Sequence, residues 1–333
     1  MHNWLMDLLE CTVCHGALEW DVTGGTESRI EAGTATCQRC AAVYPIRDGI
    51  GLFLLPDVQR RDLWEQVDNR LLQHLREHPD ARRQLMDTPT DALGPADLFY
   101  RALVLEAQGD FQQARELEEL ATQGIYTEEY LACSRSQMDY VIQQLAGSEA
   151  PVVDLASGRG KLVEQVQQTL GRNRMVVATD FSPPVLRRDR AWLQAMGWYD
   201  KVSLLAVDAR HTPFKAGSVE LLTTNLGLPN IDEPGDVLRE LRRIVDGRFL
   251  AIAHFYPVED AVNAAALRER GLITSFRREA LETLAAAGWQ AEAANVCQGL
   301  ARPTPVSDVL GGAGIDGFPL VETILEWCVI DAT

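Results

Sequence analysis

Four of the chain's seven cysteines occur as two pairs, Cys11 with Cys14 and Cys37 with Cys40. Two residues separate the cysteines of each pair, so one tight turn can direct both thiolates toward the same point. Two such turns on facing hairpins complete a tetrahedral cage of four sulfur atoms, which is a geometry that Zn²⁺ favours. The spacing therefore predicts a zinc site. Because four sulfur ligands leave no open coordination position, we expect this zinc to be structural rather than catalytic.

The alternatives are two unrelated cysteine pairs or a redox-active dithiol. A redox motif of the thioredoxin type needs a strand before the pair and a helix after it, a context that is absent here. The remaining three cysteines lie in apolar patterns and are expected to be small core residues; they are Cys133, Cys297 and Cys328.

A second group of residues suited to ligand binding is the turn Asp154–Gly160, which reads DLASGRG. Ala156, Gly158 and Gly160 let the backbone pass close to a ligand without a clash from a bulky side chain. A dinucleotide-binding turn needs a third glycine at the position of Val163, so that class is disfavoured. A phosphate-binding P-loop needs a different glycine spacing and a Ser or Thr after the lysine.

The elements around this turn alternate between short apolar runs and helical patterns. Strands are expected at 152–155, 175–178, 202–207, 219–224 and 249–253, with helices at 162–170, 184–196 and 235–245. Such alternation predicts an open, mostly parallel sheet with helices on both faces. Ligands bind these sheets at the carboxyl ends of the strands. Asp180, Asp208 and Asn225 stand at three of those ends.

Together, the turn and the strand-end residues resemble the class I S-adenosylmethionine-dependent methyltransferases. That family's turn reads [D/E]-x-G-x-G-x-G, and Ala156 replaces its first glycine. The resemblance covers about residues 125–333 and implies a Rossmann-like, mostly parallel seven-stranded sheet that binds S-adenosylmethionine. It implies that Asp180 accepts hydrogen bonds from the ribose hydroxyls, that Asp208 or the next amide reads the adenine, and that Asn225 lies near the methyl group. The implied cofactor-binding residues are Asp154, Ala156, Ser157, Gly158, Gly160, Asp180, Phe181, Asp208, Ala209 and Asn225.

The C-terminal segment also resembles this family, which ends in a helix and an antiparallel strand pair with the last strand inserted into the sheet. We expect the helix at 276–287 and the strands at 290–300 and 322–330. The connection between the two strands is longer than a hairpin needs, and long ordered loops at such an edge tend to line substrate pockets.

Methyl transfer is an in-line displacement in which the cofactor supplies the activation, so a protein base is optional. His254, at the end of the fifth strand, is the best candidate base because an imidazole titrates near neutrality. A structural, hydrogen-bonded histidine is the alternative. Tyr256 is a second catalytic candidate, and His211 and Asp260 are lesser ones. Asn225 begins NLGLP rather than the [D/N]-P-P-[Y/F] of methylases that act on amide or exocyclic amino nitrogens, which argues against those acceptors.

The first fifty residues resemble the zinc-ribbon activator subunits of tRNA and rRNA methyltransferases, most specifically in Tyr44–Ile50 (YPIRDGI). In those families the ribbon contacts RNA or braces a catalytic domain. This ribbon holds more acidic than basic residues, which favours bracing. Between the ribbon and the glycine turn, residues 56–147 show helical spacing of apolar residues. A helix pair is expected in Ala102–Leu120, turning at Gly109.

A further helix leads into the glycine turn and carries Tyr126 and Tyr130 four residues apart, on one face. These tyrosines serve core packing or form a lid over the ligand. The chain thus divides into a zinc ribbon (1–55), a helical region (56–147) and a methyltransferase domain (148–333).

The chain has 333 residues and a net charge of −17, so its surface gives no electrostatic footprint for nucleic acid. It shows neither a signal-peptide pattern nor an apolar run long enough to span a bilayer, and we expect a cytoplasmic protein. The leading interpretation is methyl transfer to a small molecule, such as a specialised metabolite. The alternatives are an RNA or protein methyltransferase that docks through the ribbon, and a non-catalytic scaffold that binds the cofactor.

Overall fold

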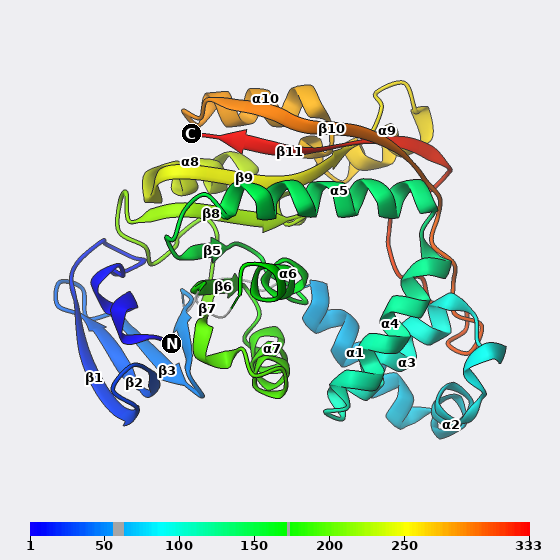
Figure 1. Ribbon diagram of the computed structural model, residues 1–333, viewed down its shortest axis with the longest axis horizontal. Coiled ribbons are helices and arrows are strands. Elements are labelled where there is room, and N and C mark those ends of the chain that lie inside the picture. Colours follow the sequence, from blue (N-terminus) through cyan, green and yellow to red (C-terminus); the bar gives the residue numbers. More distant parts are fainter. Residues whose placement is uncertain (56–62, 172–173) are drawn as a thin grey trace.

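A computed structural model of the chain describes residues 1–55, 63–171 and 174–333. Its centre is an eleven-stranded sheet in the order β1-β2-β3-β4-β7-β6-β5-β8-β9-β11-β10 (Figure 1). β5 to β9 pair in parallel, whereas β11 runs antiparallel between β9 and β10. The strands after residue 150 are β5 (Val152–Asp154), β6 (Val176–Asp180), β7 (Val202–Val207), β8 (Val219–Asn225), β9 (Val245–Phe255), β10 (Ala291–Ala301) and β11 (Thr323–Ala332).

This arrangement confirms the predicted fold class, including the insertion of the last strand beside β9. The predicted strand ends differ from the observed ones by a few residues, most at β9, which begins at Val245 instead of Phe249. The short helix α9 (Ala261–Glu269) was not expected, because its apolar residues are mostly alanines and give a weak periodic signal.

Helices cover both faces of the sheet. α5 (Glu128–Leu145), α6 (Lys161–Thr169) and α7 (Pro183–Ala195) pack on one face, and α8 (Pro234–Ile244) and α10 (Arg277–Ala286) on the other. Side chains alternate between the two cores, as strand geometry requires. Val152 and Val176 face the α5 side, whereas Val153 and Val177 face the α8 side. The parallel strands are therefore apolar on both faces.

The N-terminal ribbon adds four strands to the same sheet, so the sheet has eleven strands where the family resemblance implies seven. They are β1 (Leu18–Gly25), β2 (Ile30–Cys37), β3 (Val43–Arg47) and β4 (Ile50–Phe53). β4 lies parallel to β7, with Ile50 opposite Leu204 and Phe53 opposite Val207. This pairing covers a sheet edge whose backbone donors and acceptors would otherwise stay open.

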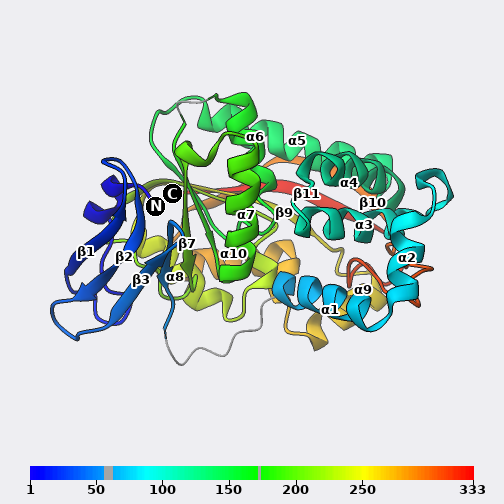
Figure 2. The ribbon, with the colours of Figure 1, turned by 90° about the horizontal axis from the view of Figure 1, so that it is seen from below.

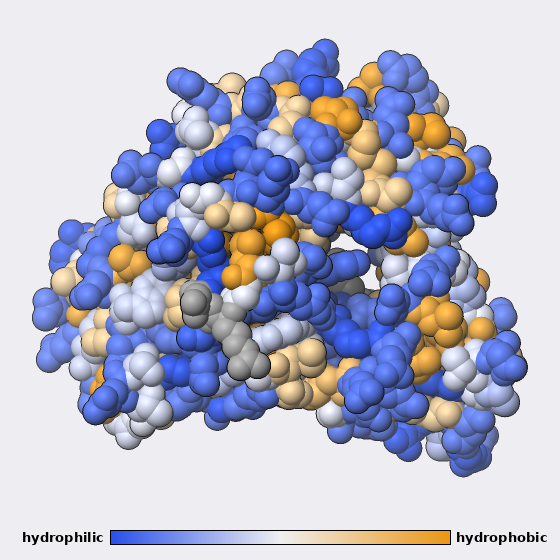
Figure 3. Space-filling view, in the orientation of Figure 1, coloured by the Kyte–Doolittle hydropathy of each residue, from blue (hydrophilic) through white to orange (hydrophobic). Residues whose placement is uncertain are grey.

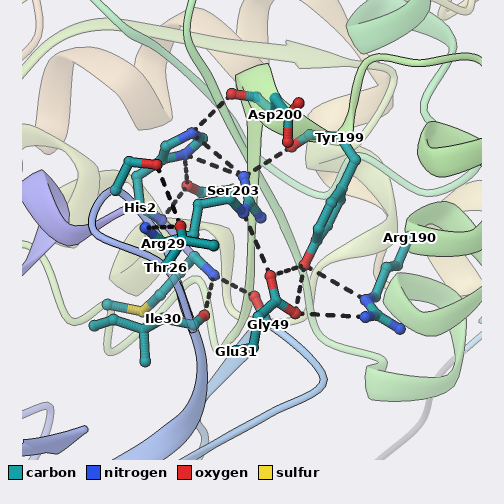
Figure 4. A network of polar contacts seen from close by, with 12 residues as sticks. His2, Thr26, Arg29, Ile30, Glu31, Gly49, Arg190, Tyr199, Asp200 and Ser203 are labelled. Carbon is teal, nitrogen blue, oxygen red and sulfur yellow. Dashed lines mark hydrogen bonds and ion pairs between the residues drawn. The ribbon is translucent and has the colours of Figure 1, made fainter. Parts of the chain in front are cut away.

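Polar contacts reinforce this junction (Figure 4). The Arg29 side chain is only 5% exposed and donates to the Tyr199 carbonyl at 2.7 Å and the Val202 carbonyl at 3.1 Å. Its guanidinium also lies 3.9 Å from the centroid of the Tyr199 ring. The Tyr199 hydroxyl donates to Glu31 at 3.0 Å, and Arg190 pairs with the same carboxylate. The ribbon is thus anchored on α7 and the segment before β7.

A helical lobe stands apart from the sheet (Figure 2). It consists of α1 (Leu63–Glu77), α2 (Pro79–Asp87), α3 (Pro95–Ala107) and α4 (Phe111–Ile125), which share a core of their own. The predicted helix pair is confirmed, with Gly109 at a left-handed φ of 86° and the Asp110 carboxylate capping α4. The predicted start of the helical region at residue 56 lies outside the described residues. None of the described helices is both long and apolar enough to cross a membrane.

The helix before the glycine turn begins later than the sequence pattern predicts. Thr127 caps α5 by accepting from the Tyr130 amide at 3.1 Å, so Tyr126 belongs to the end of α4. A threonine followed by Glu128 and Glu129 is a strong helix start, because the hydroxyl and the acids satisfy the exposed amides of the first turn. The two tyrosine rings nevertheless stack, with centroids 4.6 Å apart.

Candidate functional site

The four ribbon cysteines converge on one point. Their sulfur atoms all lie within 4.8 Å of one another, and the Cys11–Cys40 and Cys14–Cys37 pairs are each 3.5 Å apart. A tetrahedron with Zn–S bonds of 2.3 Å has edges of about 3.8 Å. The geometry therefore fits the structural zinc that the spacing predicts.

The backbone around the cysteines is built for this convergence. Each pair is followed by a residue in the left-handed region, His15 at φ 57° and Ala41 at φ 59°. The amide of that residue donates a hydrogen bond to the carbonyl of the first cysteine of its pair, which closes the turn. A side chain at Gly16 would meet the sulfurs of Cys37 and Cys14 at 3.0 and 3.3 Å. The buried Tyr44 hydroxyl contacts the Cys11 sulfur at 3.2 Å and Thr12 at 2.9 Å, which fixes the inner side of the cluster.

The predicted cofactor turn leaves β5 and enters α6. Ala156, Gly158 and Gly160 all adopt left-handed φ values, of 51°, 55° and 69°. A side chain at Gly160 would also press on the Trp192 ring at 3.1 Å. Ala156 therefore holds, as a non-glycine residue, a conformation that disfavours a Cβ atom. The turn stays tight because the Ser157 hydroxyl bonds both neighbouring strands, at Asp154 and Thr179.

Asp180 lies against this turn. One of its carboxylate oxygens accepts from the Gly158 amide at 2.9 Å, and the other accepts from the Ser182 amide at 3.0 Å. These bonds hold the carboxylate at the carboxyl end of β6, beside the glycine turn. The adjacent Phe181 is partly buried.

Asp208, which follows β7, already forms an ion pair with Arg210. It is 3% exposed, and the Arg210 guanidinium donates to both of its carboxylate oxygens at 2.8–2.9 Å. Arg210 also forms an ion pair with Glu233. Burial raises the pKa of Asp208, but the hydrogen bonds and charge of Arg210 outweigh it and lower the pKa overall. Ala209 beside it is buried. The Arg210 clamp was not foreseen from the sequence, although a basic residue two positions from an acid is a visible signal.

Two further predicted residues end neighbouring strands. Asp154, at the end of β5, is fully buried and accepts from the Thr223 hydroxyl at 2.9 Å, and burial raises its pKa to about 7. It therefore holds β5 against β8. Asn225 is the last residue of β8, opposite Ile252 of β9 and partly exposed.

The two catalytic candidates line one small cavity. His254 and Tyr256 face it from the end of β9, while Tyr126 and Tyr130 close it from the α4–α5 junction. The cavity encloses about 20 Å³, room for roughly one water molecule. The His254 ring packs edge-on against Trp327 and Tyr256, with centroids 4.9 and 5.8 Å away. The two tyrosines before the turn therefore form part of the wall of this cavity.

The His254 ring is largely buried in the cavity wall. Its buried Nδ1 has no hydrogen-bond partner among the residues that the structure describes. Burial lowers the pKa of the imidazole to about 4, so it is neutral near pH 7. A neutral imidazole in a cavity wall has one unprotonated nitrogen, which can accept a hydrogen bond from a bound molecule when it faces that molecule.

The β10–β11 connection supplies residues that sequence reasoning missed. Asp316, Phe318 and Pro319 complete the cavity wall, and the Tyr126 hydroxyl donates to Asp316 at 2.7 Å. The unusual length of this connection was the available signal, but it does not identify which residues turn inward. The lesser candidates have other positions: His211 is exposed, and Asp260 caps α9 by accepting from Asn263.

The lobe is tied to the glycine turn by buried ion pairs. The Arg159 side chain, 9% exposed, pairs with Glu106 of α3 at 2.9 Å and with Glu118 of α4 at 3.3 Å. Arg188 of α7 donates to the Gly158 carbonyl at 3.0 Å. Figure 3 shows an opening between this lobe and the sheet-bearing part of the molecule.

Two family models match parts of the chain. Residues 152–247 match the model described as a methyltransferase domain, and residues 4–49 match the one described as Trm112p-like protein. The C-terminal part is thus a methyltransferase domain with the class I fold. The N-terminal part is a Trm112p-like zinc-ribbon segment whose four cysteines are positioned for a metal.

Similar proteins include ubiquinone/menaquinone biosynthesis C-methyltransferases UbiE. Those of Hahella chejuensis and Proteus mirabilis are 28% and 30% identical over 118 and 114 residues, or 35% and 34% of this chain. The chain spans about half the length of these curated relatives, 47% and 45%. Among solved structures, the YcgJ protein of Bacillus subtilis has a TM-score of 0.46 at 15% identity, covering 60% of this chain and 97% of that one. A geranyl diphosphate methyltransferase has a TM-score of 0.45 at 17% identity, covering 68% and 84%.

Proposed function

We propose that this protein transfers the methyl group of S-adenosylmethionine to a small-molecule acceptor. The observation that carries the proposal is the Asp180 carboxylate held against the glycine turn, at the carboxyl end of a class I sheet. S-adenosylmethionine would lie across Ala156–Gly160, with its ribose toward Asp180. The acceptor would enter the cavity of His254 and Tyr256. The matched methyltransferase model and the UbiE relatives support the class of reaction.

The cofactor supplies an activated methyl group on a sulfonium, with a neutral thioether as the leaving group. The residues of this chain bind and align the acceptor, and that alignment is the main contribution a protein makes to such a displacement. The Nδ1 atom of His254 accepts a hydrogen bond from the acceptor and orients it. The lobe, linked to the turn through Arg159, limits access of water.

In this proposal the cysteine cluster holds a structural zinc, and the ribbon (1–55) braces the methyltransferase domain (148–333). The helical region (56–147) covers the cofactor. Bracing is supported by the β4–β7 pairing and by the Arg29 contacts on Tyr199.

The test is a thermal-shift titration with S-adenosylmethionine and S-adenosylhomocysteine on zinc-loaded protein. We expect both ligands to raise the melting temperature. The Asp180→Asn variant should lose about tenfold in affinity, because a carboxylate is a stronger acceptor than an amide. The matched control Asp246→Asn changes an exposed acid on β9 and should bind as wild type does. No shift with either ligand contradicts the proposal.

A second candidate is an RNA or protein methyltransferase that docks through the ribbon, which the Trm112p-like match favours. The net charge of −17 opposes RNA docking. Salt-sensitive binding of bulk tRNA or rRNA would support this candidate. Transfer of labelled methyl from the cofactor into the small-molecule fraction of a lysate would support the first, and the absence of any transfer would leave a cofactor-binding scaffold.

A further inference from the structure

We propose that the cavity beside His254 recognises an alkylammonium group of the acceptor. This inference rests on the proposed function, since it names the chemical class of the molecule that the site methylates. Three observations carry it: the aromatic residues that line the cavity, the Asp316 carboxylate, which no described basic side chain pairs with, and the buried Nδ1 atom of His254, which has no partner among the described residues.

The walls are aromatic on several sides. Tyr126 and Tyr130 stack with an interplanar angle of 9°, and Tyr130 meets Trp327 edge-on with centroids 4.9 Å apart. Tyr256 and Phe318, which also line the cavity, pack edge-on with centroids 6.3 Å apart, and the Arg270 guanidinium lies 4.7 Å from the centroid of the Phe318 ring. Aromatic faces carry negative electrostatic potential and attract cations, most strongly when water is excluded.

The unpaired charge in the lining is negative. Asp316 is exposed and accepts from the Tyr126 hydroxyl, and no basic side chain pairs with it among the described residues. The basic residue in the cavity wall, Arg302, is neutralised by Glu322 at 2.7 Å. His254 adds no positive charge near pH 7 because burial lowers its pKa. Among the described residues of the lining, Asp316 is therefore the charge that no opposite charge neutralises.

The His254 ring in the lining is the third observation, and its Nδ1 atom is a hydrogen-bond acceptor when the other ring nitrogen carries the proton. His254 Nδ1 is buried without a partner among the described residues. An ammonium group has N–H donors for this nitrogen and for Asp316, and its charge suits both the carboxylate and the rings. A carboxylate or phosphate ligand would face repulsion from Asp316 and from the ring faces. A neutral alcohol would gain the hydrogen bonds but not the charge attraction.

The cavity holds about one water molecule in this conformation, so the alkyl part of the ligand displaces part of its wall. The β10–β11 connection, which carries Asp316 and Phe318, is the wall segment without regular secondary structure. We therefore expect this connection to move when the ligand binds.

The experiment is isothermal titration of the full chain, without cofactor, with n-propylammonium and with 1-propanol, its neutral counterpart, at pH 7.5. We expect propylammonium to bind about tenfold more tightly. Asp316→Asn should remove most of this preference. Asp308→Asn, an exposed acid of the same connection, should keep it. Equal binding of the two probes, tighter binding of propanol, or no binding of propylammonium at millimolar concentrations overturns the inference.

These outcomes are independent of the proposed function. If the protein binds S-adenosylmethionine and transfers methyl groups but shows no preference for the cation, only the ligand class is wrong. If it prefers the cation but neither binds nor consumes S-adenosylmethionine, the cation site stands and the methyltransferase proposal fails.

Discussion

Ala156 shows how one side chain departs from an otherwise familiar turn. Its φ of 51° places a Cβ atom where glycine has none, at a cost of roughly 1–2 kcal/mol. We expect Ala156→Gly to raise the free energy of unfolding by about 1 kcal/mol, measured by urea denaturation. Ala265→Gly, in the exposed interior of α9, should lower it by a similar amount. A loss of stability at both positions would contradict the conformational explanation.

His254 makes stability depend on pH. Its pKa is about 4 in the folded protein against 6.5 for the free side chain. The unfolded chain therefore takes up the proton first, so this stability is complete above pH 6.5 and is lost as the pH falls toward 4. We expect wild type to lose up to about 2 kcal/mol more between pH 7 and pH 5 than His254→Gln does.

Urea titrations at the two pH values provide this comparison. The matched control is His78→Gln, an exposed histidine at the start of α2, which should follow the wild-type profile. Other buried groups contribute equally to wild type and variant and cancel in the difference. If the free energy of unfolding changes equally with pH in wild type and His254→Gln, the His254 ring has the same pKa in the folded and unfolded protein, which contradicts the prediction.

The positions of the polar residues near strand ends were predictable, because the apolar runs show approximately where the strands lie. Asp154, Asp180 and Asn225 all stand at strand ends, as the pattern predicts. Their partners were less predictable. The Arg210 clamp on Asp208 and the contact of Tyr126 with Asp316 depend on side-chain directions and on segments far apart in the chain.

At the scale of elements, the β10–β11 connection joins the sheet to the lobe. The Asp97 carboxylate of α3 is 3% exposed and accepts from the Ser307 hydroxyl and from the Val309 amide. The Tyr100 hydroxyl donates to the Gly314 carbonyl at 2.6 Å. The cavity wall at Asp316 is therefore supported from the lobe, and a substitution that breaks these bonds on α3 should loosen the cavity wall.

We expect Asp97→Ala to lower stability by about 1–3 kcal/mol, because it leaves buried donors unpaired. Hydrogen exchange of residues 303–316 should become faster, as measured by mass spectrometry. Asp91→Ala, which changes an exposed acid in the short 3-10 helix Thr90–Ala92 before α3, should change neither quantity. Unchanged exchange in Asp97→Ala would mean that the connection holds its shape without the lobe.

Element identity was predictable from periodicity, and the antiparallel insertion of the last strand followed from the family resemblance. The joining of the ribbon to β7 was not predictable, because backbone pairing at a sheet edge leaves little trace in side-chain type. The start of α5 at Glu128 was visible in the Thr-Glu-Glu sequence, but the preceding helical pattern concealed it.

At the scale of the whole molecule, the ribbon and the methyltransferase domain share one sheet and one core. Leu5 and Leu9 pack in the same cluster as Val153 and Phe249. Removal of the metal from the cysteine cluster should therefore destabilise both parts together. We expect a chelator to lower the melting temperature of the whole chain in a single transition, followed by calorimetry.

Cys11→Ser should reproduce this effect without chelator, whereas Cys328→Ser, away from the cluster, should leave the response to chelator intact. Two separate transitions, with only the smaller one sensitive to chelator, would show that the ribbon melts on its own.

The parallel pairing of β4 with β7 has one more consequence. Both strands belong to a single polypeptide, so the contact between them has a fixed one-to-one stoichiometry and a high effective concentration. Dilution therefore cannot separate the ribbon from the methyltransferase domain. Because one gene encodes both parts, their amounts are always equal. A catalytic domain produced without its ribbon would instead present a bare strand edge to its neighbours and aggregate.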